Sequence, residues 1–395
     1  MNKITKTITD FRFILAIYFT LTLAVSIHNF LLSDISRQET GYTHYNNYLI
    51  FKQSFFHLME GKNLYEPYSG EYFDLFKYSP TFALFFGGFA FFPDWLGLAL
   101  WNILNVLLLF FGFKYLPSGK KQKAWMLYFV LLELITSVQN SQSNGLMAGL
   151  LILAFVFLER KNYMGAIFLI VFSGFIKIFG LAALLLLLFY PNKIRAALYT
   201  VGWIVILGLL PVLILPLEML IRMYWEWLHM LTGDYSASLG YSVMGWLNSW
   251  FGLYPDKILL LTLGAFLLFL PLIRWNKFKN LQFRLLFLAS LLIWVVIFNH
   301  KAESPTFVIA MSGIAIWGFT GNMTLTRKIL LIVAFVLTSL TATDLFPPTI
   351  RGGYIEPYVI KAVSSIVIWA LITYELLFNR FNKLNHSIVN NKLSE

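Results

Sequence analysis

Apolar runs separated by short polar turns extend along nearly the whole chain. A helix that crosses a bilayer needs about 20 mainly apolar residues, and runs near this length recur throughout the sequence. We therefore predict an all-α fold in which residues 1–395 form one integral membrane domain, a polytopic bundle of about twelve transmembrane helices. The expected crossings are residues 12–33, 94–115, 123–138, 143–158, 163–174, 177–190, 194–217, 257–274, 281–298, 304–320, 326–343 and 357–379.

Two long loops and one short apolar run interrupt this pattern. Residues 34–79 and 218–256 are rich in aromatic side chains, and we expect amphipathic helices in both loops. In the first loop, apolar residues recur near the helical period over residues 45–60, and Gly61 would cap that helix. Such a helix is expected to lie on the membrane surface. The short run 80–92 is expected to enter the membrane only halfway.

Composition and charge placement support the membrane prediction. Hydrophobic residues make up 58% of the chain and charged residues 12%, whereas a soluble domain carries about 25% charged residues. The net charge is +11, but most basic residues lie in short turns between apolar runs. This placement follows the positive-inside rule and argues against nucleic-acid binding. We therefore predict an inner (plasma) membrane protein with cytoplasmic N- and C-termini, a cytoplasmic tail at 380–395, and both long loops outside.

Polar side chains at membrane depth are costly, so each is a candidate site residue. Residues 139–144 interrupt two apolar runs with a row of amides, and Asn140, Gln142 and Asn144 could hold sugar hydroxyls because each amide offers donors and an acceptor. The alternative is a turn whose amides cap the adjacent helices. Lys177 stands between two short apolar runs and could bind a phosphate as a point charge. Its alternative is a lysine that extends to the membrane interface.

Ionisable residues mark two more places in the predicted bundle. Residues 299–303 form a short turn between two long apolar runs, in which His300 and Glu303 could bind a phosphate and handle a proton. The alternative there is an exposed turn without a role. Glu133 lies inside a predicted crossing, where we expect a structural partner within the bundle. A proton relay is the alternative for Glu133.

The first outer loop concentrates acidic residues, although a long wet segment carries charge in any case. It holds six of the 19 carboxylates of the chain, including Glu39 and Asp74. The absence of cysteine excludes disulfides and thiolate metal sites. The sequence also lacks a glycine-rich loop with Gly-Lys-Ser/Thr and a His-Glu-x-x-His motif. No metal site is therefore predicted.

Four stretches of the chain follow one another in the order and spacing of a known family of membrane enzymes. The stretches are Gly61-Lys62-Asn63-Leu64-Tyr65 leading to Lys77-Tyr78-Ser79-Pro80-Thr81-Phe82, then Asn140-Ser141-Gln142-Ser143-Asn144, then Gly174-Phe175-Ile176-Lys177-Ile178-Phe179, and finally Ser238-Leu239-Gly240 with His300. Together they span about residues 45–305 and resemble glycosyltransferase family 87, multi-spanning enzymes of the GT-C architecture. The best-known relatives are mannosyltransferases that use polyprenyl-phosphate-mannose.

The resemblance implies a mechanism at the outer leaflet. A sugar arrives on a polyprenyl phosphate, an acidic residue takes the proton of an acceptor hydroxyl on a lipid or glycan, and the lipid phosphate leaves. Cations near the phosphate would stabilise its developing charge. Lys177, His300 and Lys77 are expected in that role, with Tyr78 beside them. No cofactor is implied, because the carrier already supplies an activated bond.

The chain departs from the family pattern at the catalytic base. The position of the family's base aspartate is occupied by Asn47, and an amide has no useful basicity near neutral pH. Three interpretations follow: a nearby acid such as Glu39 or Asp34 is the base, the base comes from elsewhere (Glu303 or Asp74), or the chain binds a lipid-linked sugar without transferring it. We favour a base from elsewhere.

Two other classes of function compete with a glycosyltransferase. A transporter or flippase for a lipid-linked glycan predicts polar residues through the full bilayer depth and two related halves, and the sequence shows neither clearly. A structural or assembly protein predicts that substitutions at Lys177, Gln142 or Glu303 leave envelope glycans unchanged. Because the polar residues gather at the predicted outer ends of the helices, we favour an enzyme that opens to the outer leaflet.

Overall fold

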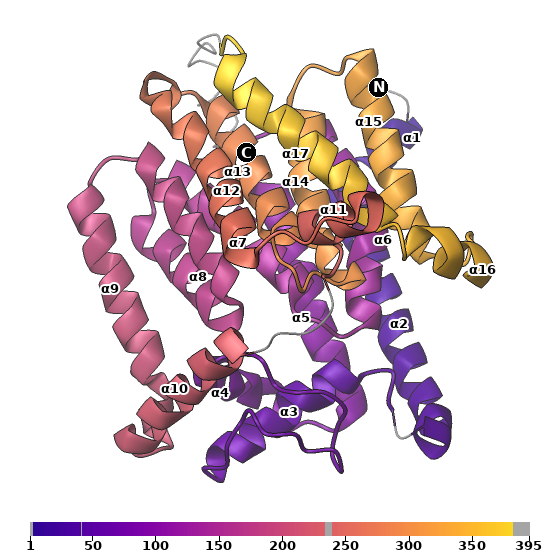
Figure 1. Cartoon of the computed structure of the whole chain (residues 1–395), viewed down its shortest axis with the longest axis vertical. Coiled ribbons are helices and arrows are strands. Elements are labelled where there is room, and N and C mark those ends of the chain that lie inside the picture. The colour runs from indigo at the N-terminus through magenta and orange to yellow at the C-terminus, as the bar shows by residue number, and fades with distance from the viewer. Residues whose placement is uncertain (1–2, 41, 234–238, 382–395) are drawn as a thin grey trace.

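The computed structural model describes residues 3–40, 42–233 and 239–381, without the side chains of residues 3–4 and 34–40, and every element in these ranges is a helix (Figure 1). The α-helices of the bundle are α1 (Lys3–Ile8), α2 (Phe11–Thr40), α5 (Asp94–Tyr115), α6 (Lys120–Gln139), α7 (Asn144–Glu159), α8 (Tyr163–Ile176), α9 (Lys193–Leu209), α12 (Lys257–Phe269), α13 (Leu281–Ile297), α14 (Phe307–Thr320), α15 (Leu325–Ala334) and α17 (Ile360–Phe378). The α-helices of the loops are α3 (Asn46–Met59), α4 (Pro80–Ala90), α10 (Leu217–Gly233), α11 (Val243–Phe251) and α16 (Pro348–Ile350).

The centre of the bundle is formed by helices that are apolar on all sides. Helix α7 is buried continuously over residues 144–156, and α14 over residues 307–318. A helix without a polar face must be covered on every side, and α5, α6 and α13 supply that cover. The peripheral helix α9 instead exposes apolar side chains, among them Ile194 and Leu198. This inverted pattern is typical of a helix that faces lipid.

Five of the described helical segments are long and apolar enough, by length and composition, to cross a membrane: Phe11–Ser33, Asp94–Tyr115, Lys193–Leu213, Leu325–Ala342 and Ile360–Phe378. Shorter apolar helices accompany them, at Pro80–Ala90, Asn144–Glu159, Tyr163–Ile176, Ile178–Phe189, Lys257–Ile273, Leu281–Ile297 and Ser304–Thr320. The chain is therefore a polytopic helical membrane protein. The count of about twelve crossings stays a prediction.

Several elements differ from the expected regular helices. The predicted crossing at 177–190 is a 3₁₀ helix, η1 (Ile178–Phe189), which follows the extended backbone of Lys177. The predicted crossing at 326–343 begins as α15 and continues as a π turn (Phe335–Ser339) and a 3₁₀ turn (Leu340–Ala342). Short 3₁₀ turns also follow α9 and α12, at Leu210–Leu213 and Leu270–Ile273. Apolar periodicity predicts that a segment is buried, but it does not distinguish these helix types.

The first outer loop folds into α3 as predicted, and Gly61 ends this helix with a positive φ of 67°. The amide of Lys62 donates to the carbonyl oxygen of His57 at 2.9 Å, as in a glycine-terminated helix. The expectation that α3 lies on the membrane surface stays a prediction, and the structure shows what covers the helix on its inner side. Its apolar face is covered by protein, because the ring of Phe51 packs edge-on against Phe82 and Trp101 at centroid distances of 5.2 and 5.6 Å.

Helix α4 occupies the segment that was expected to enter the membrane only halfway. Its 11 residues span about 16 Å at 1.5 Å per residue, which is too short for a hydrocarbon core of about 30 Å. Ser79 caps the helix by accepting a hydrogen bond from the amide of Phe82 at 3.2 Å, and its hydroxyl donates to the carbonyl oxygen of Phe175 at 2.6 Å. Helices α3, α4 and α10 lie together at one end of the bundle (Figure 1).

Candidate functional site

The turn between α6 and α7 is held in place by side chains from other helices. The indole Nε1 of Trp101 donates to the carbonyl oxygen of Ser141 at 2.8 Å. Asn29 Nδ2 donates to the carbonyl oxygen of Gln139 at 2.6 Å, and Asn105 Oδ1 accepts from the amide of Leu146 at 2.8 Å. These bonds tie α2 and α5 to the turn, so its amides are presented from a rigid frame.

The amides of this turn divide between two tasks. Asn140 Nδ2 donates to the carbonyl oxygen of Thr136 at 2.8 Å and so caps the end of α6, as the capping alternative expected. Gln142 and Asn144 bond instead to each other, since Asn144 Nδ2 donates to Gln142 Oε1 at 2.5 Å. Two of the three predicted amides are therefore part of a side-chain network.

A continuous chain of hydrogen bonds joins a lysine to a carboxylate through these two amides. Lys177 Nζ, at the junction of α8 and η1, donates to Asn144 Oδ1 at 2.7 Å. At the other end, Gln142 Nε2 donates to Glu303 Oε2 at 2.7 Å. In each of these bonds the donor lies on the Lys177 side and the acceptor on the Glu303 side. The amides of Asn144 and Gln142 are therefore oriented in the same sense between the positive lysine and the negative glutamate. Hydrogen bonds in such a chain polarise and strengthen one another.

Tyr78 and Asn47 lie against the same turn. The hydroxyl of Ser143 bonds to the phenol oxygen of Tyr78 at 3.4 Å, and Lys177 Nζ lies 5.8 Å from the centroid of the Tyr78 ring. Burial raises the pKa of the Tyr78 phenol, and the charge of Glu303 raises it further, so the phenol stays protonated. Asn47 Nδ2 donates to the carbonyl oxygen of Asn140 at 2.8 Å. Asn47, at the position of the family's base, is therefore a hydrogen-bond donor in this structure.

Lys77, His300 and Glu39 complete the set of predicted site residues. Lys77 Nζ pairs with Asp74 Oδ2 at 3.1 Å, and both side chains are exposed. His300 belongs to the same turn as Glu303, and a Cβ on Gly240 would lie 2.6 Å from its carbonyl oxygen. Glu39 lies in α2, but its side chain is outside the described part of the structure. Ser238 of the fourth stretch also lies outside the described residues.

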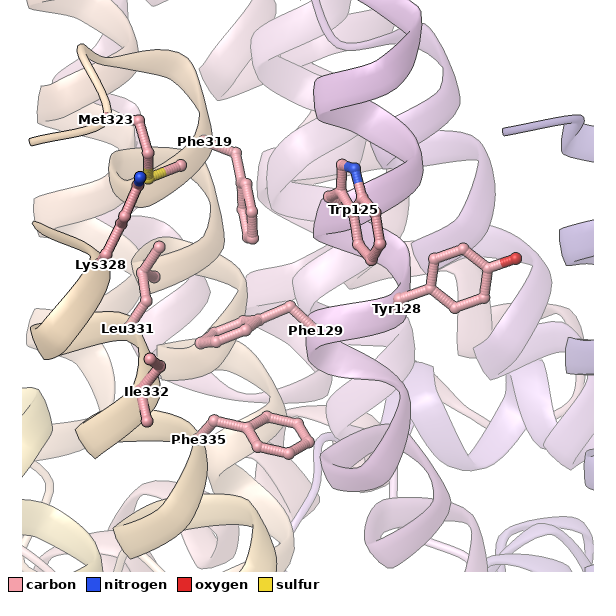
Figure 2. A pocket seen from close by; sticks show the side chains of 9 residues that line it. All are labelled: Trp125, Tyr128, Phe129, Phe319, Met323, Lys328, Leu331, Ile332 and Phe335. Atoms are coloured by element: carbon pink, nitrogen blue, oxygen red, sulfur yellow. The ribbon is translucent and has the colours of Figure 1, made fainter. Parts of the chain in front are cut away.

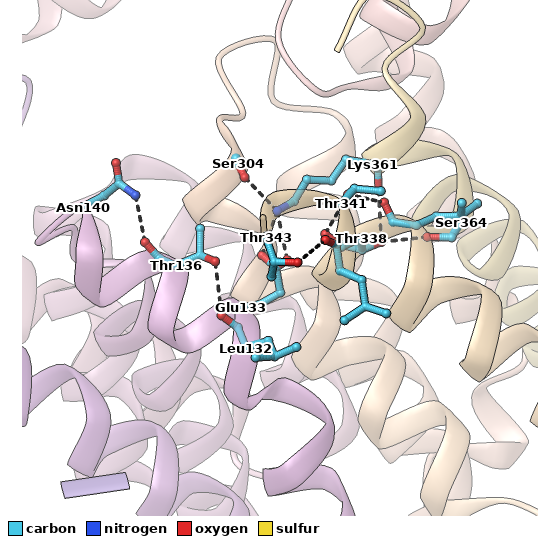
Figure 3. Close-up of polar contacts among 12 residues, drawn as sticks. Leu132, Glu133, Thr136, Asn140, Ser304, Thr338, Thr341, Thr343, Lys361 and Ser364 are labelled. Carbon is cyan, nitrogen blue, oxygen red and sulfur yellow. Dashed lines mark hydrogen bonds and ion pairs between the residues drawn. The ribbon is translucent and has the colours of Figure 1, made fainter. Parts of the chain in front are cut away.

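The partner of Glu133 is not among the residues predicted from the sequence. Figure 3 shows Lys361 directed towards this carboxylate, with Nζ 2.9 Å from Oε1 and 3.1 Å from Oε2. The expected structural partner of Glu133 is therefore confirmed. Lys361 Nζ also donates to the hydroxyl of Ser304 at 2.7 Å, next to Glu303 in the chain. The rule that flags ionisable residues in apolar segments applies equally to Lys361 and would have found it.

An apolar groove lies between α6, α14 and α15, remote from this network (Figure 2). It has a volume of about 550 Å³, and Lys328 is the one charged residue among those that line it. Its wall includes Trp125, near the start of α6, whereas the amide turn follows the end of that 20-residue helix. A helix of this length spans about 30 Å, so the groove is not part of the polar site.

Comparison with known proteins gives an independent classification. No curated protein matches the chain. The family model described as glycosyltransferase family 87 matches residues 76–299. The matched region contains Tyr78, the amide turn and Lys177, but it ends before His300 and Glu303 and begins after Asn47. Because it covers more than half of the 395 residues, this helical membrane protein belongs to glycosyltransferase family 87.

Proposed function

We propose that the chain transfers a hexose, mannose-like in type, from a polyprenyl-phosphate carrier to an envelope lipid or glycan at the outer leaflet of the inner membrane. Membership of the family supports glycosyl transfer in a membrane. The donor class, the GT-C type of the enzyme and the orientation with cytoplasmic termini are parts of this proposal. The orientation rests on the lysines and arginines of the short turns between apolar segments.

One observation carries the proposal: the hydrogen-bonded chain from Lys177 through Asn144 and Gln142 to Glu303. Transfer from a sugar phosphate needs a base for the acceptor hydroxyl and positive charge near the leaving phosphate. The chain of bonds holds a carboxylate and a lysine in one fixed arrangement. It thereby brings the two required charges into the same site from distant parts of the sequence.

In this mechanism Glu303 takes the proton from the acceptor hydroxyl. The hydroxyl oxygen then forms a bond to the anomeric carbon, while the bond between that carbon and the phosphate oxygen breaks. The polyprenyl phosphate leaves with the electron pair, and Lys177 stabilises its added charge. Glu303 suits the role of base, because its side chain is exposed and its Oε1 makes no hydrogen bond to the described residues.

The other candidates for the base fit less well. Asn47 donates its amide to the α6–α7 turn and lacks a basic atom. Asp74 is paired with Lys77, and no described hydrogen bond connects it with Lys177 or the amides. We assign Asn47 and Asn140 to the recognition of sugar hydroxyls, since Asn140 is exposed at the rim of the turn. His300, Lys77 and Tyr78 remain proposed contacts of the donor headgroup.

The test is transfer by the purified full-length protein in lipid nanodiscs. Labelled polyprenyl-phospho-hexoses serve as donors and an envelope lipid extract as acceptor. We expect transfer by the wild-type protein, and a loss of about 100-fold or more in Glu303→Gln, since general base catalysis contributes about 10²–10⁴. Asp74→Asn is the matched control. Asp74 has a φ of 75°, which asparagine also tolerates, so this variant should retain most activity.

Two outcomes would overturn the proposal. If the wild-type protein binds the donors but transfers sugar from none of them, the assignment of polyprenyl-phosphate transfer fails. If Asp74→Asn loses activity and Glu303→Gln keeps it, transfer occurs with a different base, and the assignment of Glu303 fails.

A further inference from the structure

A second cavity includes in its wall Ala302, the residue that precedes Glu303. It has a volume of about 560 Å³ and is bounded by the loop that leads into α11, by α11 itself, by Ala302 and by the segment before α17. Its polar lining consists of Tyr241, Asn248, Ser249, Tyr254 and Glu356. The proposed mechanism uses none of these side chains.

The wall of this cavity is fixed directly to the candidate catalytic turn. The amide of Tyr241 donates to the carbonyl oxygen of Ala302 at 2.8 Å, and Ala302 immediately precedes Glu303. The preceding residue, Gly240, has a φ of 58°. A Cβ at this position would lie 2.6 Å from the carbonyl oxygen of His300 and 2.9 Å from that of Ala302. The backbone of the loop therefore rests on the turn at a distance that only glycine permits.

The lining has the chemistry that recognises neutral, hydroxyl-rich molecules. A carboxylate accepts hydrogen bonds, an amide both donates and accepts them, and a serine hydroxyl and tyrosine phenols can do either. The Asn248 amide makes no side-chain hydrogen bond to the described residues, and neither does the exposed carboxylate of Glu356. Tyr254 is 81% exposed and offers an aromatic face. Polar groups left without protein partners are available to a ligand.

The charge of the cavity separates it from a phosphate site. Its described lining contains no lysine, arginine or histidine, and its one charged residue is Glu356. An anionic headgroup would be repelled by this carboxylate and would find no cation. The lysine of the candidate site, Lys177, lies instead at the far end of the bonded chain from Glu303. The cavity and the Lys177 end of the bonded chain thus differ in the charge that they can accept.

We propose that this cavity is the acceptor subsite and holds one or two neutral sugar units of the acceptor glycan through Asn248, Glu356 and Tyr254. The proposal rests on the proposed function, in which Glu303 receives the proton of the acceptor hydroxyl. It narrows the acceptor class from a lipid or glycan to a neutral glycan. The donor, with its phosphate, would approach from the side of Lys177.

Binding and transfer can be tested separately with the full-length protein in nanodiscs. Saturation-transfer NMR measures the binding of α-mannobiose, a neutral disaccharide, with mannose 6-phosphate as the charged comparison. We expect the neutral probe to bind the wild-type protein and Glu303→Gln equally. Its Kd should rise about tenfold in Asn248→Ala and Glu356→Gln, because the first variant removes and the second weakens the hydrogen bonds proposed for the sugar hydroxyls, and a tenfold change corresponds to about 1.4 kcal/mol. Glu218→Gln, an exposed glutamate on α10 outside this cavity, is the matched control and should bind normally.

Steady-state transfer provides the second readout. In Asn248→Ala and Glu356→Gln, the KM for the glycan acceptor should rise about tenfold, while the KM for the lipid-linked donor stays within twofold. Tyr254→Leu should act in the same direction, and its high exposure makes loss of folding an implausible cause. Equal thermal unfolding midpoints confirm that each variant is folded.

The outcomes separate this proposal from the proposed function. One outcome is that transfer depends on Glu303, while substitutions at Asn248, Glu356 and Tyr254 change neither probe binding nor the KM for the acceptor. That outcome refutes the acceptor subsite and leaves the transferase function standing. Stronger binding of mannose 6-phosphate than of α-mannobiose at this cavity would also refute it. If the neutral probe binds with the predicted dependence but no donor supports transfer, the sugar-binding site stands and the proposed function fails.

Discussion

Lys361 Nζ lies 2.9 Å from Glu133 Oε1 inside the helix bundle, where both side chains are almost completely buried (Figure 3). The same ammonium group donates to the hydroxyl of Ser304 at 2.7 Å. The pair therefore joins α6 and α17 to the turn that carries Glu303. This contact between distant segments links a structural ion pair to Ser304, the residue that follows the candidate catalytic carboxylate.

Removing one partner of this pair should destabilise the protein strongly. In Glu133→Gln or Lys361→Met, the remaining charge stays buried without an opposite charge, a change that costs about 3–5 kcal/mol. The double variant Glu133→Leu/Lys361→Met buries no charge and should recover most of the loss. Thermal unfolding in detergent checks this order. Single variants as stable as the double variant would show that the pair does not hold the bundle together.

The sequence predicted those features that depend on neighbours along the chain. The apolar period over residues 45–60 located α3, and Gly61 marked its end, because periodicity and a left-handed cap are local properties. The cost of polar atoms in a membrane also singled out Glu133, Gln142 and Lys177, and the partner expected for Glu133 is confirmed. Each of these predictions depends on the type of the residue and its position along the chain, and not on its neighbours in space.

The identity of the partners could not be predicted in the same way. Lys361 is 228 positions from Glu133, and Glu303 is 161 positions from Gln142. One sequence without structure does not show which flagged residues meet. The protein cover over the apolar face of α3 could not be predicted for a related reason. Its apolar face fits a membrane or a neighbouring helix equally well, and only tertiary packing on Phe82 and Trp101 decides between them.

Two glycines with nearly the same backbone conformation provide a controlled test of the contact between the α11 loop and the turn that carries Glu303. Gly240 and Gly252 have φ values of 58° and 66°, so alanine at either position costs about 1–2 kcal/mol in backbone strain. A Cβ at Gly252 meets nothing within 4 Å, whereas one at Gly240 strikes the carbonyl oxygen of His300. Gly240→Ala should therefore lower the unfolding midpoint further and also reduce transfer. Equal effects of the two variants would show that the loop does not press on the turn.

His57 should make the stability of the first outer loop depend on pH. Its Nε2 lies 2.9 Å from Glu71 Oε2, but burial lowers the pKa of His57 below its ordinary value of 6.5 despite the opposing effect of Glu71. The unfolded chain therefore takes up a proton at a higher pH than the folded protein does. The stability contribution is fully present above about pH 6.5 and is lost as the pH falls through the folded pKa.

The pH dependence is measured as the unfolding midpoint between about pH 7.5 and pH 5.5, where one extra proton in the unfolded state changes stability by at most about 1.4 kcal/mol per pH unit. Wild-type protein should lose stability over this interval, and His57→Gln should lose less. His229→Gln removes an exposed histidine on α10 and should follow the wild type. If His57→Gln and the wild type have the same slope, protonation of His57 is not coupled to folding.

Lys177→Met should weaken the binding of the phosphate-bearing donor more than that of the acceptor. Methionine keeps the length of the side chain but removes the charge and the bond to Asn144 Oδ1. A charge-assisted hydrogen bond is worth about 1.5–3 kcal/mol, so kcat/KM for the donor should fall at least tenfold. Lysine supplies a point charge and arginine a planar fork, and Lys177→Arg should therefore recover activity only in part.

The control for Lys177→Met is Lys62→Met, which removes an exposed lysine that pairs with Glu60. It tests whether any loss of positive charge lowers the local concentration of the anionic donor. Raising the ionic strength screens such long-range attraction but leaves a direct contact largely intact. If Lys62→Met matched the loss of Lys177→Met at low salt and both losses vanished at high salt, Lys177 would contribute only to the general field. A loss confined to Lys177→Met and retained at high salt identifies a direct contact with the donor phosphate.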